Sequence, residues 1–321
     1  MMKKIYVTRK LPSLIMNRLH ENFDVNYWND EDDPVPRDVL LNEIKDCEGL
    51  FCMLTETIDE ELLDAAPKLK IVANLAVGYN NIDIEAAKSR NVIVTNTPGV
   101  LSETTADLTF ALMLASARRL VETSEVVRNG TWGAWSPMHY TGQDVHGKTL
   151  GIIGLGRIGE AVAKRSTGFD MNVLYHNRRR NEEAESRLGV TYASFHELLK
   201  HSDFIVLLLP YSKSNHHLIG SQEIGLMKRE AILINTARGG LVDEDALYHA
   251  LENREIFGAG LDVFEEEPVP LTNPLLQSKY VTTSPHIGSA SIETRLHMCH
   301  LVTDNLIHVL SGKDPLTPVT K

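Results

Sequence analysis

Hydrophobic and polar positions alternate along the chain in short blocks, which predicts a repeating order of strand and helix. In the first hundred residues, short apolar runs predict strands at 5–7, 25–28, 49–53, 69–74 and 92–95. Between them, apolar residues at helical spacing predict helices at 13–23, 39–45, 60–66 and 82–90. Strands that alternate with helices through short loops are typical of an open, largely parallel sheet.

The series breaks at Pro98-Gly99, and a stretch at 103–119 follows that is apolar nearly all round. Such a stretch predicts a buried helix, and we place the crossing between two domains here. The alternation restarts at Thr149, with further strands predicted at 172–175, 190–192, 204–209, 231–235, 257–263 and 280–283. Helices are predicted at 121–128, 195–200, 243–253 and 291–310, and the last of them could return to the first lobe.

A glycine-rich turn begins the second series. Gly154, Gly156 and Gly159 form G-x-G-x-x-G between a predicted strand and a predicted helix. In that position the first glycine permits the tight turn and the second lets the backbone approach a pyrophosphate. The third lets helix and strand pack closely. A glycine-rich turn after any buried strand can match this pattern, but the flanks on both sides favour a dinucleotide site.

Composition narrows the class of protein. A length of 321 residues allows two domains, and a net charge of −11 argues against nucleic-acid binding. Three sparse cysteines, without metal-ligand spacing, indicate reduced thiols in a cytoplasmic protein and no bound metal. The sequence shows no signal-peptide pattern after Met1 and no apolar run of membrane-spanning length, so we expect no membrane association.

The loop at 130–137 carries Trp132 and Trp135 among glycines and a proline. Two indoles in such a loop fit a role at an interface or a pocket. Packing at the domain junction is an equally good interpretation.

Three clusters of polar residues follow predicted strands, where open α/β sheets collect their ligands. Arg238 lies between a strand end and two glycines, and its planar fork suits a carboxylate. Glu267 ends a run of glutamates, and His286 lies between a proline and an Ile-Gly pair. Each residue alone has an ordinary surface or structural interpretation. Together they fit carbonyl reduction, because a glutamate beside an imidazole stabilises the protonated ring that donates to the carbonyl oxygen.

These motifs together resemble the D-isomer-specific 2-hydroxyacid dehydrogenase family. The resemblance covers nearly the whole chain, in segments at 76–83, 104–107, 154–159, 207–210, 218–219, 227–244, 260–268 and 284–288. It implies an α/β fold of two Rossmann-like, doubly wound parallel-sheet domains, with the cofactor domain inserted into a flavodoxin-like substrate domain. We therefore expect a substrate domain at 1–100 plus 290–321 and a dinucleotide-binding domain at 101–289, in a homodimer.

The resemblance also implies roles for single residues. Arg238 would orient the 2-oxo acid, His286 would donate the proton, and Glu267 would be its partner. Substrate contacts would further come from the N–H groups of Val77 and Gly78 and from Leu54. The loop that carries Trp132 and Trp135 is most similar to the corresponding loop of glyoxylate/hydroxypyruvate reductases. By this resemblance, Trp135 would reach the active site of the partner subunit. The implied cofactor contacts are Thr105, Gly154, Leu155, Gly156, Arg157, Ile158, Gly159, Pro210, Thr236, Ala237, Arg238, Asp262, His286 and Gly288.

The end of the second strand after the glycines indicates which nicotinamide cofactor is bound. It carries Asn177, Arg178 and Arg179, with no carboxylate before Glu182. A carboxylate there would bind the ribose hydroxyls of NAD, whereas arginines pair with a 2′-phosphate. We therefore expect NADP(H) to be preferred, with NAD(H) possible. A basic solvent-exposed loop is the alternative.

The leading hypothesis is a reductase of glyoxylate, hydroxypyruvate or a similar small 2-oxo acid. A 2-ketogluconate or other sugar-acid reductase is the alternative within the family. Phosphoglycerate dehydrogenase and formate dehydrogenase fit less well, because the chain has no room for a regulatory domain and lacks the acidic strand end. A non-catalytic protein that senses dinucleotides is the alternative of another class. The choice of substrate depends on the volume around Met53, Leu54, Trp135 and Met138, which sequence spacing does not give.

Overall fold

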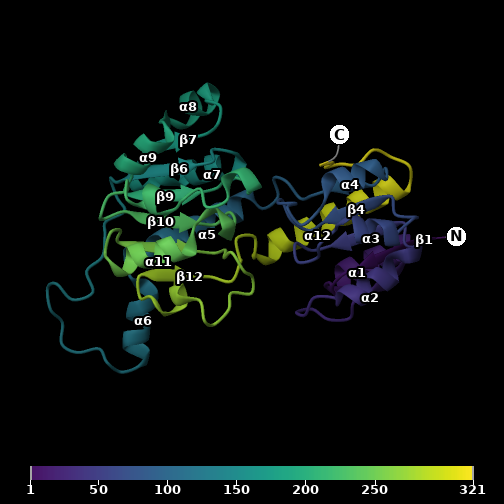
Figure 1. Cartoon of the computed structure of the whole chain (residues 1–321), viewed down its shortest axis with the longest axis horizontal. Coiled ribbons are helices and arrows are strands. Elements are labelled where there is room, and N and C mark those ends of the chain that lie inside the picture. The colour runs from purple at the N-terminus through teal and green to yellow at the C-terminus, as the bar shows by residue number, and fades with distance from the viewer. Residues whose placement is uncertain (1, 320–321) are drawn as a thin grey trace. The chain divides into compact units, whose positions relative to one another are not determined.

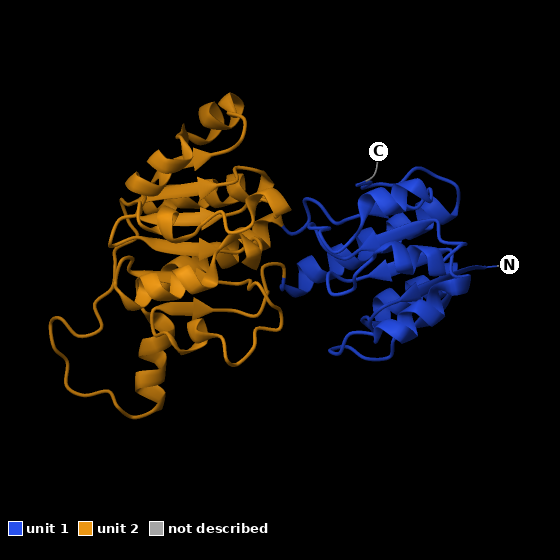
Figure 2. Cartoon of the chain, in the orientation of Figure 1, with its two compact units in different colours: residues 1–101, 290–321 blue, residues 102–289 orange. Residues whose placement is uncertain are grey.

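The computed structural model describes residues 2–319 and divides the chain into two compact units (Figure 1, Figure 2). Unit 1 combines Met1–Leu101 with Ala290–Lys321, and unit 2 is the segment Ser102–Ser289 between them. Each unit is built on its own sheet.

Unit 1 contains a five-stranded sheet in the order β2-β1-β3-β4-β5, with every neighbouring pair parallel. This strand order is that of flavodoxin-like folds. β3 and β4 are buried along their whole length, which explains why their sequences are continuously apolar or small. The strands are β1 (Lys3–Val7), β2 (Phe23–Tyr27), β3 (Gly49–Cys52), β4 (Ile71–Asn74) and β5 (Ile93–Thr95).

The helices of unit 1 begin where the sequence supplies capping side chains. Asp59, Asp83 and Ser291 each accept a hydrogen bond from a backbone N–H in the first turn of the helix that follows. The last helix, α12, contacts β3, β4 and α1, so the end of the chain packs on the sheet formed by its beginning. The helices are α1 (Ser13–Asn22), α2 (Arg37–Glu43), α3 (Glu60–Ala65), α4 (Ile84–Ser89) and α12 (Ile292–Leu310).

Unit 2 contains a seven-stranded parallel sheet in the order β12-β11-β10-β9-β6-β7-β8. The order reverses between β6 and β9, as in Rossmann folds, and ligands bind at such a point beyond the carboxyl ends of the strands. The strands are β6 (Thr149–Ile153), β7 (Asn172–His176), β8 (Thr191–Tyr192), β9 (Phe204–Leu207), β10 (Ile232–Asn235), β11 (Gly258–Leu261) and β12 (Val281–Thr283).

The helices of unit 2 differ sharply in burial. α5 buries eight residues and packs on α7, β10 and β11, as its apolar sequence predicts. None of the residues of α6 is buried, and this helix projects from the unit together with the loop that follows it (Figure 1). The helices are α5 (Ser102–Ala117), α6 (Leu120–Arg128), α7 (Arg157–Ser166), α8 (Glu182–Leu188), α9 (Phe195–His201), α10 (Ser221–Ile224) and α11 (Glu244–Glu252).

The predicted alternation of strands and helices, and the fold class of two doubly wound parallel sheets, are confirmed. Helices α8 and α10 were not predicted from the pattern, and the strand expected at 204–209 already ends at Leu207. Cys47, Cys52 and Cys299 are buried and free of disulfides, whereas the cytoplasmic location stays a prediction. Within residues 2–319, no helix has the length and apolar character needed to cross a membrane.

Candidate active site

The glycine-rich turn lies at the switch point of the unit 2 sheet, between β6 and α7. Gly154 has φ +106°, a value in the left-handed half of the map that favours glycine. Gly156 is the N-cap of α7 and has no side chain to cap the helix, so the N-terminus of α7 is open to an anion. A Cβ on Gly156 would meet no described atom within 4 Å, which leaves room for a ligand at this residue.

Gly159 serves a different purpose in the same turn. A Cβ at Gly159 would lie 2.5 Å from the carbonyl oxygen of Gly154, because the first turn of α7 packs directly on the loop. Arg157 is exposed and Ile158 half-buried in that turn. The positive φ of Gly154 and the close packing at Gly159 thus agree with two of the functions that the motif predicts, and the approach of a pyrophosphate to Gly156 stays a prediction.

Asn177, at the end of β7, binds the backbone of the glycine turn. Its Oδ1 accepts from the N–H of Leu155 at 2.7 Å, and its Nδ2 donates to the Leu155 carbonyl at 3.1 Å. The turn is thus braced by the neighbouring strand end. Because the N–H of Leu155 already donates to Asn177, it helps to fix the shape of the turn and is not a free donor for a ligand.

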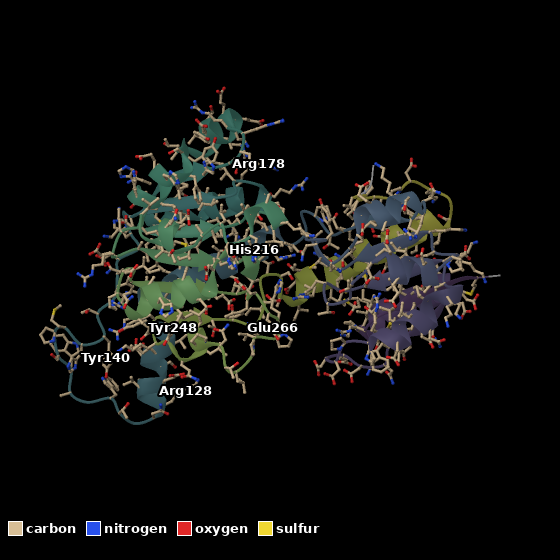
Figure 3. All side chains as sticks on the ribbon, in the orientation of Figure 1. Arg128, Tyr140, Arg178, His216, Tyr248 and Glu266 are labelled. Atoms are coloured by element: carbon tan, nitrogen blue, oxygen red, sulfur yellow. The ribbon has the colours of Figure 1, made fainter. Side chains whose placement is uncertain are left out.

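Three arginines follow Asn177, and they differ in their partners. Arg180 forms two hydrogen bonds with Glu185, at 2.8 and 2.7 Å, and that carboxylate also accepts from Tyr175. Arg178 and Arg179 are exposed and form no ion pair with any residue of 2–319. Figure 3 shows Arg178 near the end of β7. Two cations without partners therefore stand where the sequence predicts a 2′-phosphate.

Asp262, which follows β11, organises the loop that carries His286. Its carboxylate accepts from Ser284 Oγ at 2.6 Å and from the N–H groups of Ile287 and Gly288, both at 2.8 Å. Its carbonyl oxygen accepts from the N–H of His286 at 2.8 Å. Burial raises the pKa of Asp262, although these hydrogen bonds oppose the shift. The bonds hold His286 at φ +53°, a conformation that costs a residue other than glycine about 1 kcal/mol or more.

His286 and Glu267 are joined by a hydrogen bond between the imidazole Nδ1 and the carboxylate Oε2, which lie 2.6 Å apart. The second carboxylate oxygen, Oε1, accepts from the N–H of Phe264 at 3.0 Å. Burial raises the pKa of Glu267, but the hydrogen bond and charge of His286 outweigh it, and the net pKa is lowered. Glu267 is therefore a carboxylate at neutral pH, and its contact orients the ring with Nε2 left for another partner.

Arg238 follows β10, one residue after Ala237 and two after the buried Thr236. Its Nη1 donates to the Ala237 carbonyl at 2.6 Å, and Asn235 Nδ2 holds the Arg238 carbonyl at 2.8 Å. Burial lowers the pKa of Arg238, while the charge of Glu267 raises it. The structure thus couples a half-buried cation to the carboxylate that orients His286.

Further residues that were predicted to contact the cofactor lie at the same edge of the sheet. Thr105, in the first turns of α5, is close to Gly288: a Cβ there would lie 3.6 Å from the Thr105 hydroxyl. Thr236 bonds through its hydroxyl to Thr109 at 2.9 Å, and Pro210 is exposed just beyond β9. The sequence did not predict that the loops are held by Asn177, Asn235 and Asp262. Short polar residues at strand ends carry no distinctive spacing.

In unit 1, the predicted substrate residues follow β3 and β4. Leu54 is half-buried in the loop after β3. The residues on either side of it are held by the buried Glu56, whose carboxylate accepts from Met53 N–H at 2.7 Å and from Thr55 Oγ1 at 2.6 Å. Glu56 also pairs with the buried Arg9 at 3.2 Å. Val77 and Gly78 are half-buried in the loop after β4.

Trp132 and Trp135 lie on the loop that projects beyond α6, with 65% and 81% of their surfaces exposed. The two indoles are therefore not part of the core of unit 2, and their packing at a domain junction stays an alternative prediction. Figure 3 shows Tyr140 on the same loop, away from Glu266, the neighbour of Glu267. The loop does not approach the predicted catalytic residues of its own unit 2.

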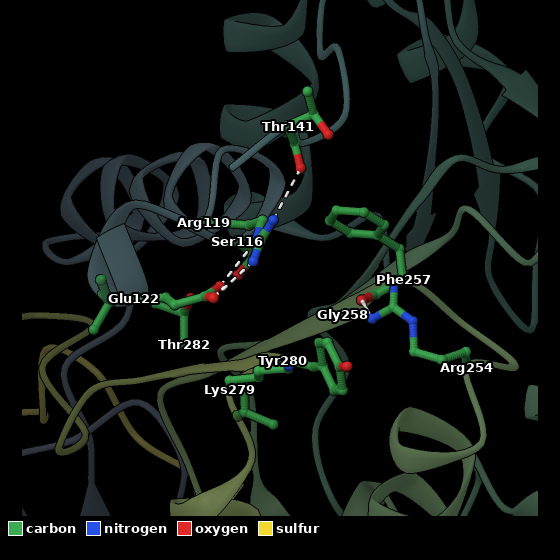
Figure 4. Close-up of a pocket in the computed structure, with 12 residues that line it drawn as sticks. Ser116, Arg119, Glu122, Thr141, Arg254, Phe257, Gly258, Lys279, Tyr280 and Thr282 are labelled. Atoms are coloured by element: carbon green, nitrogen blue, oxygen red, sulfur yellow. Dashed lines mark hydrogen bonds and ion pairs between the residues drawn. The ribbon is translucent and has the colours of Figure 1, made fainter. Parts of the chain in front are cut away.

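A cavity of about 350 Å³ lies elsewhere in unit 2, among Arg119, Glu122, Arg254, Phe257 and Tyr280 (Figure 4). It adjoins Gly258 and Val281, the first residues of β11 and β12, and so lies at the amino edge of the sheet. None of the predicted catalytic or cofactor residues lines it. This cavity is therefore separate from the candidate site, because the glycine turn and the His286–Glu267 pair lie at the opposite edge of the sheet.

A Rossmann sheet, an open glycine turn and a carboxylate-bound histidine beside an arginine define a nicotinamide-dinucleotide-dependent oxidoreductase. A sequence model described as the NAD-binding domain of D-isomer specific 2-hydroxyacid dehydrogenases matches residues 110–288. The chain belongs to the D-isomer specific 2-hydroxyacid dehydrogenase family.

Proteins of similar sequence and structure match this chain over nearly its full length. A glyoxylate reductase of Korarchaeum cryptofilum is 49% identical over 316 residues, which cover 98% of this chain and 95% of that protein. A protein of Thermus thermophilus has a solved structure with a TM-score of 0.92, at 43% identity and with 99% and 100% of the two chains covered. The NADPH-dependent glyoxylate/hydroxypyruvate reductase of Sinorhizobium meliloti, solved with NADP and malonate, has a TM-score of 0.86 at 35% identity, covering 99% and 97%.

Proposed function

We propose that this chain reduces glyoxylate, hydroxypyruvate or a similar small 2-oxo acid to the D-2-hydroxy acid with NADPH. The observation that carries the proposal is the 2.6 Å contact between His286 Nδ1 and Glu267 Oε2, next to Arg238. The names of the relatives, glyoxylate reductase and glyoxylate/hydroxypyruvate reductase, support the choice of substrate.

The proposed proton donor is His286 Nε2. Because Glu267 holds Nδ1, a protonated ring presents Nε2–H to the carbonyl oxygen of the substrate, and the proton moves to that oxygen as the carbonyl carbon is reduced. The Glu267 carboxylate stabilises the imidazolium before the transfer. Arg238 binds the substrate carboxylate and polarises its carbonyl group through its guanidinium.

The residues around the glycine turn fit a dinucleotide. The left-handed Gly154, the open N-terminus of α7 and the free space at Gly156 provide room and N–H donors for a pyrophosphate. When bound, the nicotinamide supplies a hydride to the carbonyl carbon of the substrate. Thr105, Pro210, Thr236, Asp262 and Gly288 are assigned to the cofactor site, and Leu54, Val77 and Gly78 to the substrate.

The preference for NADPH rests on Arg178 and Arg179. Both are exposed without an ion-pair partner in 2–319, while the adjacent Arg180 is bound to Glu185. Unpaired guanidinium groups suit a 2′-phosphate, whose charge they complement. The Sinorhizobium meliloti relative is described as NADPH-dependent, which supports the same choice.

We also propose a homodimer formed through α6 and the loop beyond it. Apolar side chains are exposed in succession here: Leu120 at 60%, Val127 at 58%, Trp135 at 81% and Met138 at 75%. Exposed apolar side chains gathered on one projecting segment mark an interaction surface. In the dimer, Trp135 would reach the partner's active site. Size-exclusion chromatography with light scattering tests this, and a monomer at micromolar concentration would contradict it.

The activity is tested by following absorbance at 340 nm with NADPH and with NADH, against glyoxylate, hydroxypyruvate, pyruvate and 2-ketogluconate. Fast turnover of glyoxylate or hydroxypyruvate is expected, and His286→Gln should lower kcat by about 100-fold or more. Faster turnover of 2-ketogluconate would identify a sugar-acid reductase instead. Tight NADPH binding without any turnover would favour a protein that senses dinucleotides.

A further inference from the structure

The loop after β4, residues 76–79, has three successive carbonyl oxygens held by buried or half-buried donors; we call it the amide loop. The donors are the backbone N–H of Thr97 at 2.9 Å, Asn96 Nδ2 at 2.8 Å and Asn74 Nδ2 at 3.0 Å. They bind, in that order, the carbonyl oxygens of Ala76, Val77 and Gly78.

A hydrogen bond that holds a carbonyl oxygen also fixes the direction of the N–H group in the same peptide. In a trans peptide the carbonyl of one residue and the N–H of the next point in opposite directions. The N–H groups of Val77, Gly78 and Tyr79 therefore point away from the donors. Within residues 2–319, no acceptor is found for these three N–H groups. The amide loop thus presents donors that the fold itself does not use.

The two asparagines are themselves firmly placed. Asn74 is the last residue of β4 and fully buried, and its Oδ1 lies 3.6 Å from Cys52 Sγ. Asn96 follows β5, and its carbonyl oxygen accepts from Thr317 Oγ1 at 2.6 Å. Donors fixed in this way set the direction of the peptides before a ligand arrives, which is the condition for preorganised anion binding.

We infer that Asn96 and Asn74 are positioning residues that aim the N–H groups of Gly78 and Tyr79, respectively, at the carboxylate of the 2-oxo acid, beside the Val77 N–H that Thr97 fixes. The inference rests on the proposed function and adds Tyr79 N–H as a third donor to those of Val77 and Gly78. A carboxylate accepts charge-assisted hydrogen bonds from backbone N–H groups. Without the asparagine amides, the Val77–Gly78 and Gly78–Tyr79 peptides lose these anchors, and the N–H groups of Gly78 and Tyr79 lose the direction that they share with Val77 N–H.

The test replaces each amide and separates substrate binding from cofactor binding. Asn96→Ala and Asn74→Ala are assayed for the KM of glyoxylate and NADPH, and for oxalate binding to the complex with NADPH by isothermal titration calorimetry. The glyoxylate KM and oxalate Kd should rise about 10- to 100-fold, the range of a lost hydrogen bond to a charged group. The NADPH KM should not change.

A matched control and a second variant keep the result interpretable. Asn22 makes the same kind of bond in unit 1, from Nδ2 to the Arg18 carbonyl at 2.8 Å, outside the amide loop. Asn22→Ala should therefore keep the wild-type oxalate Kd. Asn96→Leu has a similar size and no charge but lacks the donor, and it should weaken oxalate binding as Asn96→Ala does. Because Asn96 is half-buried, its variants decide the matter if Asn74→Ala fails to fold.

Two outcomes would overturn the inference: folded Asn96 variants that bind oxalate as wild type does, or a rise in NADPH KM that matches the rise for glyoxylate. The failure of the proposed function looks different. A wild-type protein that turns over no 2-oxo acid, yet loses oxalate affinity on Asn96→Ala, supports the inference and contradicts the proposed reaction.

Discussion

The glycine turn of unit 2 and the amide loop of unit 1 both follow a parallel strand and both present backbone N–H groups, but they are held in different ways. In the glycine turn, the backbone itself adopts the required shape: Gly154 has φ +106°, and Gly159 lets α7 pack on the loop. In the amide loop, the shape is imposed from outside by Asn74 and Asn96. No glycine with positive φ occurs in the amide loop.

This difference determines what a sequence reveals. A turn that depends on missing Cβ atoms leaves a pattern of glycines at fixed spacing, which is readable without a structure. A loop held by asparagine amides leaves two ordinary polar residues that are far apart in the chain and meet only at neighbouring strand ends. The predictions below test whether the two loops depend on these separate supports.

The largest effect is expected from the glycine turn. Gly156→Ala adds a Cβ that meets no described atom within 4 Å, so the free protein should keep its wild-type melting temperature. The Cβ would occupy the space proposed for the pyrophosphate, and the Kd for NADPH should rise roughly 100-fold, the upper end of the range for one lost hydrogen bond to a charged group. Calorimetry and thermal unfolding measure the two quantities on the same sample.

Gly159→Ala is the counterpart in the same turn. Its Cβ would lie 2.5 Å from the Gly154 carbonyl oxygen, so the backbone must shift, and the free energy of unfolding should fall by about 1–3 kcal/mol. Wild-type NADPH affinity in Gly156→Ala would show that the cofactor does not approach this residue and would remove the basis of the comparison.

A smaller effect is expected at the end of β7. Replacing both Arg178 and Arg179 by alanine should raise the KM of NADPH by about 10-fold and leave that of NADH unchanged, because only NADPH carries the 2′-phosphate. Arg180→Ala is the matched control, since Arg180 is already bound to Glu185 and should change neither value. Equal effects on both cofactors would contradict the preference for NADPH.

Much of the fold follows from local pattern. Strands such as β9 and β10 are continuously apolar and buried, and capping residues such as Asp243 mark the beginnings of helices. Helix α8 escaped prediction because its sequence is nearly all polar and only Ala184 is buried, so no apolar period marks it. Helix α10 spans only four residues, too few to show a period.

The candidate site was predictable where chemistry demands a rare arrangement. Arg238, Glu267 and His286 were found because each follows a strand and because the family motifs frame them. The supports were not: Asp262 binds the His286 loop through three hydrogen bonds to its carboxylate and one to its carbonyl oxygen, and only the fold brings these groups together. Trp135 and Met138 on the projecting loop are exposed, and their proposed function rests on the dimer hypothesis.

The smallest effect concerns the charge of the side chains that support each loop, which is a further difference between the two units. The His286 loop depends on carboxylates, whereas the bonds to the amide loop come from neutral amides. The pKa of Glu267 is lowered by His286 despite the opposing effect of burial. A carboxylate with a lowered folded pKa stabilises the protein fully above its unfolded pKa, and this stabilisation is lost as pH falls through the folded value.

The free energy of unfolding of the wild type should therefore decrease below about pH 4.5, the ordinary range of a glutamate, more steeply than that of Glu267→Gln. Because Glu267 is partly exposed, the difference should be about 1 kcal/mol or less. Asn96→Ala should keep the wild-type slope, since it removes no titrating group. Urea unfolding at a series of pH values measures all three slopes. A Glu267→Gln slope equal to that of the wild type would show that the ion pair makes no net contribution to stability, and that the charged and neutral supports do not differ in this respect.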